Sequence, residues 1–128
     1  MEILKLLRRQ TMLTNKDYCD YDTCVALNEL GLSFEDTSQR FERNILICRY
    51  EEVPRPSLYE AQKWLREERG VIVEVFVDDD SDTPITYNIY KDSKCIVHHH
   101  GNYYSVKDWN VTLLEGIKEA IKLLKEEK

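Results

Sequence analysis

The chain has 128 residues and a mass of 15.2 kDa, which suffices for one hydrophobic core but not for two of independent stability. Its 42% apolar, 10% aromatic and 33% charged residues exclude the disordered, collagen-like and membrane-spanning classes over most of the length. The net charge of -6 has the wrong sign for holding a phosphate backbone, so nucleic acid is a disfavoured partner.

The first residues do not have the pattern of a secretory signal. Lys5 interrupts the apolar stretch, Arg8 and Arg9 follow it instead of preceding it, and no small-residue cleavage site comes after. No apolar run approaches the roughly 18 to 20 residues that cross a bilayer. The four cysteines are scattered, which favours reduced thiols over disulfides. We therefore expect a cytoplasmic protein with no membrane partner. The cysteines are Cys19, Cys24, Cys48 and Cys95.

A helix is predicted to begin at Tyr21. The Asp20 side chain can accept a hydrogen bond from the first free amides, and Gly31 permits a left-handed exit. After it, residues 44–50 are predicted to form a strand, and residues 34–41 are a second candidate for a short one.

Two prolines, Pro54 and Pro56, suggest a weak boundary after this part of the chain. Residues 1–53 are thus predicted to be a helix-and-strand module that packs on a core formed by residues 54–128. The two parts are expected to make one compact unit.

The core is predicted to begin and end with a helix. Ser57 and Glu60 form a capping box, and Gly70 closes the helix that follows. Asp108 is predicted to cap the last helix. One apolar stripe marks the buried side of that helix: Leu113, Ile117, Ala120, Ile121 and Leu124.

Alternating residues predict strands at 71–77 and 85–90, and a turn at Asp92–Ser93 leads into a strand at 95–100. Gly101–Asn102 has the composition of a two-residue hairpin, which would add a fourth strand at 103–106. The predicted fold is α+β: an antiparallel β-meander of three to four strands flanked by helices, in the order α-β-β-β-α over residues 57–126.

Two-residue turns at both positions would pair Ile89 with Ile96, Tyr90 with Cys95, and His99 with Tyr104. The face predicted to pack under the two helices then holds Val71, Val73, Val75, Ile85, Tyr87, Ile89 and Ile96. The opposite face holds Ile72, Phe76, Tyr90, Val97, Tyr104 and Val106.

This second face is too apolar to be left wholly in water. We expect residues 1–53 to cover it or, failing that, a second subunit in a homodimer or another protein. Phe76, Tyr90 and Tyr104 are the candidate interaction residues. A one-residue slip in register would change this sorting.

The sequence contains only weak candidates for metal-binding or cofactor-binding residues. His98 and His100 stand about 6.6 Å apart on one strand face and could share an ion, but further ligands would have to come from elsewhere. Histidines near water are the simpler interpretation. The acidic residues 78–82 do not have the glycine and glutamate of an EF-hand loop. No glycine-rich turn accompanies any cysteine or suits a phosphate group. We expect no cofactor and no enzymatic activity.

Three segments carry a resemblance to known sequences: residues 18–27, residues 56–68 and residues 114–120. They resemble small uncharacterised proteins encoded by phages and mobile elements of gut bacteria. The resemblance extends over most of the chain from about Thr14 onward. It implies a biological setting but neither an activity nor site residues.

The leading hypothesis is a non-enzymatic protein of a phage or mobile element that acts by protein–protein contact. The alternative is a nucleic-acid-associated regulator, because the order α-β-β-β-α is that of a double-stranded-RNA-binding domain. Against it, the loop at residues 78–82 and the start of the last helix at Asp108 are acidic where such domains meet phosphate. A small zinc or cysteine enzyme is the third hypothesis.

Overall fold

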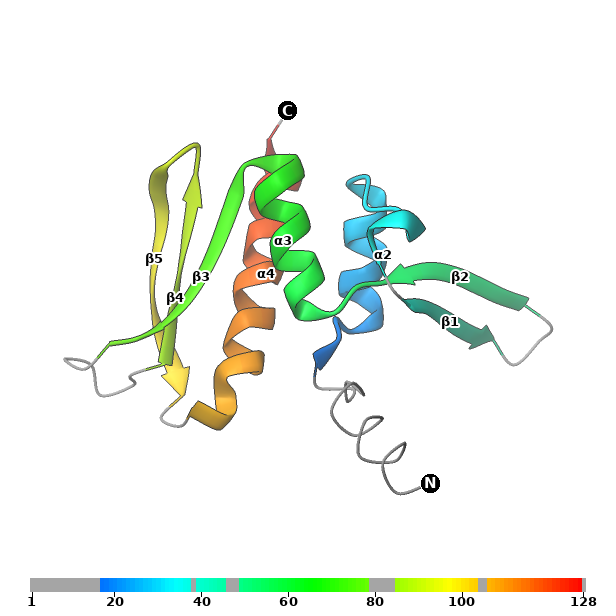
Figure 1. Ribbon diagram of the computed structural model, residues 1–128, viewed down its shortest axis with the longest axis horizontal. Helices are drawn as coiled ribbons and strands as arrows, with labels where there is room; N and C mark the ends of the chain where they lie inside the picture. The colour runs from blue at the N-terminus through cyan, green and yellow to red at the C-terminus, as the bar shows by residue number, and fades with distance from the viewer. Residues whose placement is uncertain (1–16, 38, 46–48, 79–84, 104–105, 128) are drawn as a thin grey trace, which may run out of the picture.

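The computed structural model describes residues 17–37, 39–45, 49–78, 85–103 and 106–127 (Figure 1). In chain order its elements are α2 (Tyr21–Glu29), the 3-10 turn η2 (Phe34–Asp36), β1 (Gln39–Ile45), β2 (Arg49–Arg55), α3 (Leu58–Arg69), β3 (Val71–Val77), β4 (Ile85–Lys91), β5 (Lys94–Tyr103), the 3-10 turn η3 (Val106–Asp108) and α4 (Trp109–Glu126).

The protein has an α+β fold in which β3, β4 and β5 form an antiparallel sheet with β4 in the centre. Helices α3 and α4 cover one face of this sheet, and α2 with the β1–β2 hairpin lies on the far side of the helices (Figure 1). The predicted order of a helix, a meander of strands and a helix is therefore confirmed. None of the helices in the described ranges is long and apolar enough to cross a bilayer.

The predicted caps explain where α2 and α3 begin. The Asp20 carboxylate accepts a hydrogen bond from the Thr23 amide at 2.8 Å. Ser57 Oγ accepts from the Glu60 amide at 3.0 Å, and the Glu60 carboxylate accepts from the Ser57 amide at 2.9 Å. Gly70 ends α3 with a left-handed φ of 65°. Each interaction satisfies backbone groups that a helix end leaves unpaired.

Helix α4 begins where the sequence predicts, but Asp108 does not cap it through its side chain. The backbone of Asp108 (φ -91°, ψ 10°) is not extended because η3 leads directly into the helix, and a capping side chain needs the extended conformation. Instead, the Asp108 carbonyl accepts a hydrogen bond from the Thr112 hydroxyl at 2.9 Å.

The strand predicted at residues 44–50 is wrong. This stretch contains the end of β1 and the start of β2, which pair antiparallel as a hairpin, and residues 46–48 between them lie outside the described residues. The candidate strand at 34–41 is replaced by η2 and the beginning of β1. Pro54 lies within β2 and pairs with Arg40. A two-stranded sheet has only edge strands, which tolerate a residue without an amide proton.

The predicted hairpin at Gly101–Asn102 is also wrong, because both residues lie within the single strand β5. The fourth strand is therefore absent from the described part of the chain: residue 103 ends β5, residue 106 begins η3, and residues 104–105 are not described. His99 pairs with Tyr87 instead of Tyr104. Gly101 and Asn102 instead lie in an irregular stretch of β5 between the pairs His99–Tyr87 and Tyr103–Ile85.

The turn at Asp92–Ser93 is confirmed, with positive φ angles of 50° and 69° that match the twist of a tight hairpin. Beyond it, Tyr90 pairs with Cys95 as predicted, but Ile89 pairs with Val97 instead of Ile96. An irregularity in β5 inserts one extra residue there. As a result Val97 packs against the core, and Ile96, predicted to be buried, is 46% exposed.

The hydrophobic core is a single cluster that joins α2 to the sheet through α3 and α4. The predicted stripe of α4 is buried, as are Val71, Val73, Ile85, Tyr87 and Ile89 on the face below it. Gly116 lets α4 approach this face closely: a Cβ atom there would lie 2.5 Å from Val73 Cγ1. The Tyr87 hydroxyl donates a hydrogen bond to the Glu119 carboxylate, and Gln62 Nε2 donates to the Val73 carbonyl at 2.6 Å. These contacts fasten both helices to the sheet.

Candidate functional site

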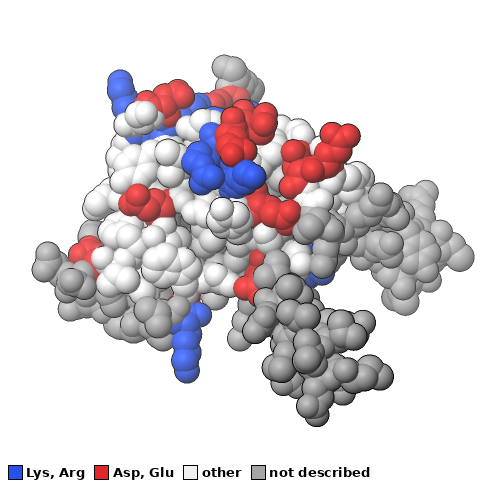
Figure 2. All heavy atoms as spheres, in the orientation of Figure 1, with Lys and Arg blue, Asp and Glu red and all other residues white. Residues whose placement is uncertain are grey.

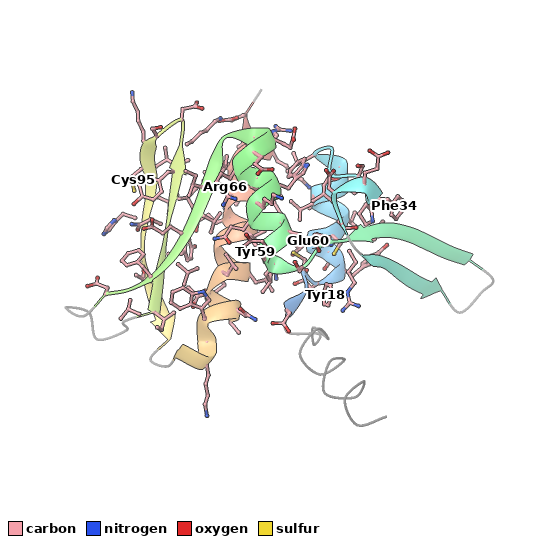
Figure 3. All side chains as sticks on the ribbon, in the orientation of Figure 1. Tyr18, Phe34, Tyr59, Glu60, Arg66 and Cys95 are labelled. Carbon is pink, nitrogen blue, oxygen red and sulfur yellow. The ribbon has the colours of Figure 1, made fainter. Side chains whose placement is uncertain are left out.

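The face of the sheet turned away from α3 and α4, called the outer face below, is the candidate site. Strand alternation and register place its side chains in rows across the three strands. One row is Ile72, Tyr90 and Cys95; the middle row is Glu74, Asn88 and His98; a third begins with Phe76 and Thr86. Figure 3 shows Cys95 on the side of the sheet away from the helices.

The outer face is apolar in its first and third rows. Ile72 is 38% exposed, and Phe76 and Tyr90 are half-buried. Thr86, which pairs with Phe76, is buried. The described part of residues 1–53 does not provide the cover that we expected, because it packs beyond α3 and α4 (Figure 1). Residues 1–16 lie outside the described residues. Apolar side chains on a face that no described helix covers are typical of an interaction surface.

The middle row is polar, and its centre contains an unsatisfied group. Asn88 is only 7% exposed, and its Nδ2 donates to the Tyr90 hydroxyl at 3.3 Å. Its Oδ1 is buried and accepts no hydrogen bond from the described residues. A buried carbonyl oxygen without a donor lowers stability by about 1–3 kcal/mol. The centre of the row is therefore a buried polar group, with the exposed Glu74 and His98 on either side of it.

The structure brings Phe76 and Tyr90 to the outer face, as the sequence predicts. Val97, assigned to this face, instead packs against the core, because the irregularity in β5 changes its register. Val106 belongs to η3. Tyr104 lies outside the described residues.

The predicted metal pair is only partly described. His98 is exposed on the outer face, and the side chain of His100 lies outside the described part. Within the described residues, no group of three or more histidine, cysteine or acidic side chains could hold a metal ion. Cys95 shares the outer face with His98 and is exposed.

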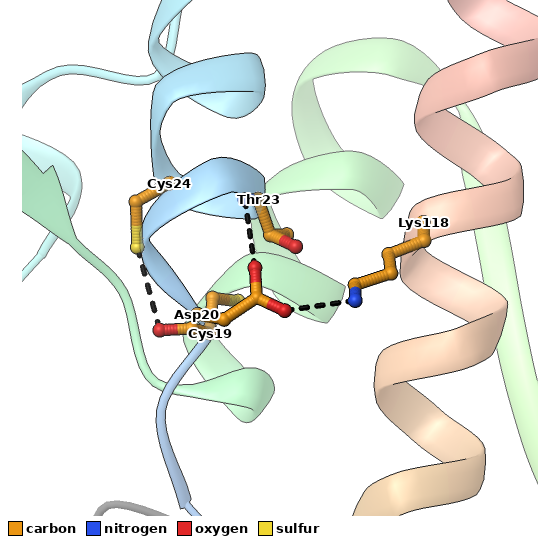
Figure 4. A network of polar contacts seen from close by, with 5 residues as sticks. All are labelled: Cys19, Asp20, Thr23, Cys24 and Lys118. Carbon is orange, nitrogen blue, oxygen red and sulfur yellow. Dashed lines mark hydrogen bonds and ion pairs between the residues drawn. The ribbon is translucent and has the colours of Figure 1, made fainter.

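The cysteines near α2 are unsuited to nucleophilic chemistry. Burial raises the pKa of the Cys24 thiol to about 12, and burial with the neighbouring Cys24 raises the pKa of Cys19 well above its usual range. Cys24 Sγ donates a hydrogen bond to the Cys19 carbonyl at 3.5 Å (Figure 4). A nucleophilic cysteine must be a thiolate, so both of these are structural groups.

An open groove of about 650 Å³ lies between the start of α2 and the start of α4. At its edge the Arg55 guanidinium stacks 4.3 Å from the centre of the Tyr18 ring. Asp20 joins the two helices there, because its second oxygen lies 2.8 Å from Lys118 Nζ (Figure 4). The remaining lining mixes apolar residues with both signs of charge: Cys19, Tyr21, Lys107, Asp108, Asn110, Val111 and Leu114.

A smaller groove of about 280 Å³ between η2 and α3 is acidic (Figure 2). Its carboxylates come from Glu35, Asp36, Glu60, Glu67 and Glu68. Two of these carboxylates stabilise local structure: Asp36 accepts hydrogen bonds from Ser33, and Glu60 belongs to the α3 capping box. We regard this groove as a solvated helix surface.

Sequence reasoning missed the roles of Glu74 and Asn88, although strand alternation already placed them on the same face as Ile72. It also missed Arg55 and Tyr18, whose contact joins positions distant in the chain. The only signal for the middle row was polar residues alternating with apolar ones. No protein family, curated protein or solved structure was found to match this chain.

Proposed function

We propose that the protein is a non-enzymatic binding module of a phage or other mobile element that acts by protein–protein contact through its outer face. One observation carries the proposal: an apolar sheet face with Ile72 exposed and Phe76 and Tyr90 half-buried has no helix of the described residues above it. Burying such side chains against a partner contributes favourable free energy in proportion to the apolar area removed from water.

The test compares charge substitutions at two exposed apolar residues, Ile72 and Val111. Ile72→Asp puts a charge on the outer face, and Val111→Asp puts one at the start of α4, where Val111 is 45% exposed. Purified wild type and both variants are measured by light scattering alone and after incubation with lysate of a bacterial host. We expect Ile72→Asp alone to lose association, whether with itself or with another protein. Equal association by all three proteins would refute the proposal.

The alternative is a nucleic-acid-associated regulator, and the observation that favours it is the topology of α3, β3, β4, β5 and α4. The charges oppose it, because β3 leads into Asp78 and α4 follows Asp108. A gel shift with double-stranded RNA over a range of salt concentrations tests this alternative. Salt-dependent binding would support it, and no shift at low salt would exclude it.

A further inference from the structure

We propose that the occupant of the outer face is a second copy of this chain, related to the first by a two-fold axis parallel to β4. This inference rests on the proposed function and specifies its partner. Two sheets would pack face to face in a symmetric sandwich, with the helices of each copy on the outside.

The middle row carries the geometric argument. It places a carboxylate on β3 (Glu74), a carboxamide on β4 (Asn88) and an imidazole on β5 (His98). A carboxylate only accepts hydrogen bonds, a carboxamide both donates and accepts, and an imidazole can donate. A two-fold axis along β4 reverses the order of the row in the second copy. Each Glu74 then faces the His98 of the other copy, and the two Asn88 side chains face each other.

Asn88 is suited to the position on the axis. It is uncharged and only 7% exposed, and its Nδ2 donates to the Tyr90 hydroxyl, so the centre of the row adds no charge at the axis. Packed sheets lie about 10 Å apart, a gap that facing side chains fill from both sides. The uncharged Asn88 side chains then lie opposite each other without electrostatic repulsion.

The apolar rows obey the same symmetry. Under this axis the row of Ile72, Tyr90 and Cys95 faces its own copy in reverse order, so apolar groups meet apolar groups. A two-fold axis across the strands would instead place Glu74 on Glu74 of the other copy, and like charges at contact are unfavourable. That arrangement also has no donor opposite the carboxylate.

Net charge does not oppose the dimer at this surface. Each chain has a formal charge of -6, but Glu74 is the single acidic residue in the described rows of the outer face. Other carboxylates lie around α3 and η2, beyond the helices (Figure 2). Two copies would therefore meet with one carboxylate from each chain in these rows.

The experiment measures molar mass against protein concentration by sedimentation equilibrium. We expect a wild-type dimer. Glu74→Arg and His98→Glu, both at exposed positions, should each weaken it about tenfold or more. The double variant should restore it, because arginine then faces glutamate across the axis. Glu68→Arg, an equal change of charge on α3, is the matched control and should leave the dimer unchanged. Circular dichroism verifies that every variant is folded.

Three results would overturn the proposal: a wild-type monomer at all concentrations, a dimer that neither single variant weakens, or a double variant without recovery, which would indicate a different axis. A wild-type monomer whose Ile72→Asp variant loses a host protein would refute the second copy while leaving the proposed function intact. Loss of neither kind of association would refute both.

Discussion

Replacing Gly116 with alanine tests how closely α4 packs on the sheet. The added methyl carbon would lie 2.5 Å from Val73 Cγ1 and 3.2 Å from Tyr87 Cγ, well inside the roughly 3.5–4.0 Å of an ordinary carbon contact. Val73 is fully buried and β-branched, so its side chain has little freedom to rotate away. Overpacking of this kind costs about 1–3 kcal/mol.

The opposing effect is the helix propensity of alanine, which favours the variant by about 1 kcal/mol at an interior helix position. Because the contact at 2.5 Å is so short, we expect overpacking to prevail and the free energy of unfolding to fall by about 1–2 kcal/mol. Urea denaturation followed by circular dichroism measures this change.

The same substitution in a Val73→Ala variant tests whether the contact with Val73 causes the loss of stability. Val73→Ala removes the methyl group at 2.5 Å but leaves the Tyr87 ring at 3.2 Å, so Gly116→Ala should destabilise that variant less than it destabilises the wild type. If Gly116→Ala raises the stability of the wild type, the close approach of α4 does not constrain the fold, and the packing argument is refuted.

Three further predictions concern other parts of the chain. Ser57→Ala should lower the free energy of unfolding by about 0.5–2 kcal/mol through loss of the α3 cap, and an unchanged urea midpoint would count against the capping box. Burial opposes ionisation of Asp20, but hydrogen bonds from Lys118 and Thr23 outweigh it and lower its pKa below 3.8. The ionised Asp20 therefore stabilises the fold fully above its unfolded pKa of about 3.8, and this stabilisation is lost as the pH falls through the lower pKa of the folded state. Asp20→Asn keeps a capping side chain without the charge, so the free energy of unfolding of the wild type should be about 0.2–1 kcal/mol higher at neutral pH and equal in strong acid. Urea titrations at several pH values measure this difference, and a difference that does not change with pH would contradict the assignment. Phe76→Asp should unfold the protein or dissociate a dimer, which circular dichroism and light scattering distinguish; unchanged mass and stability would indicate that this face is open to water.

Local signals in the sequence predicted the helices and the first two strands of the sheet. Side-chain caps at Asp20 and Ser57 and the left-handed residue Gly70 act within a few residues of the chain, so their effect can be worked out from the sequence. Strand alternation likewise predicted that Ile72, Phe76 and Tyr90 share a face. The apolar part of the candidate site was therefore predictable.

The remaining features depend on pairing between distant segments. Whether the chain turns at Gly101–Asn102 or continues as one strand depends on how the flanking His99 and Tyr103 pair with β4, which composition does not reveal. The extra residue before Val97 moves the following part of β5 to the opposite face, a change of one position that no alternation pattern marks. The unsatisfied amide of Asn88 emerges only when its neighbours on β3 and β5 are known.

The hydrogen bond from Gln62 to the Val73 carbonyl has a consequence for aggregation. The amide of Asp92 donates to the Gly70 carbonyl at 3.3 Å, so alternation along β3 points the backbone groups of Val73 away from β4, toward the open edge of the sheet. The sequence of β3, VIVEVFV, combines high β propensity with a single charge, which is typical of strands that recruit further strands.

A strand that added to this edge would need the carbonyl that Gln62 already occupies at 2.6 Å. Helix α3 thus protects the middle of an aggregation-prone edge with one side chain, and the sheet is hindered from growing strand by strand into a fibril.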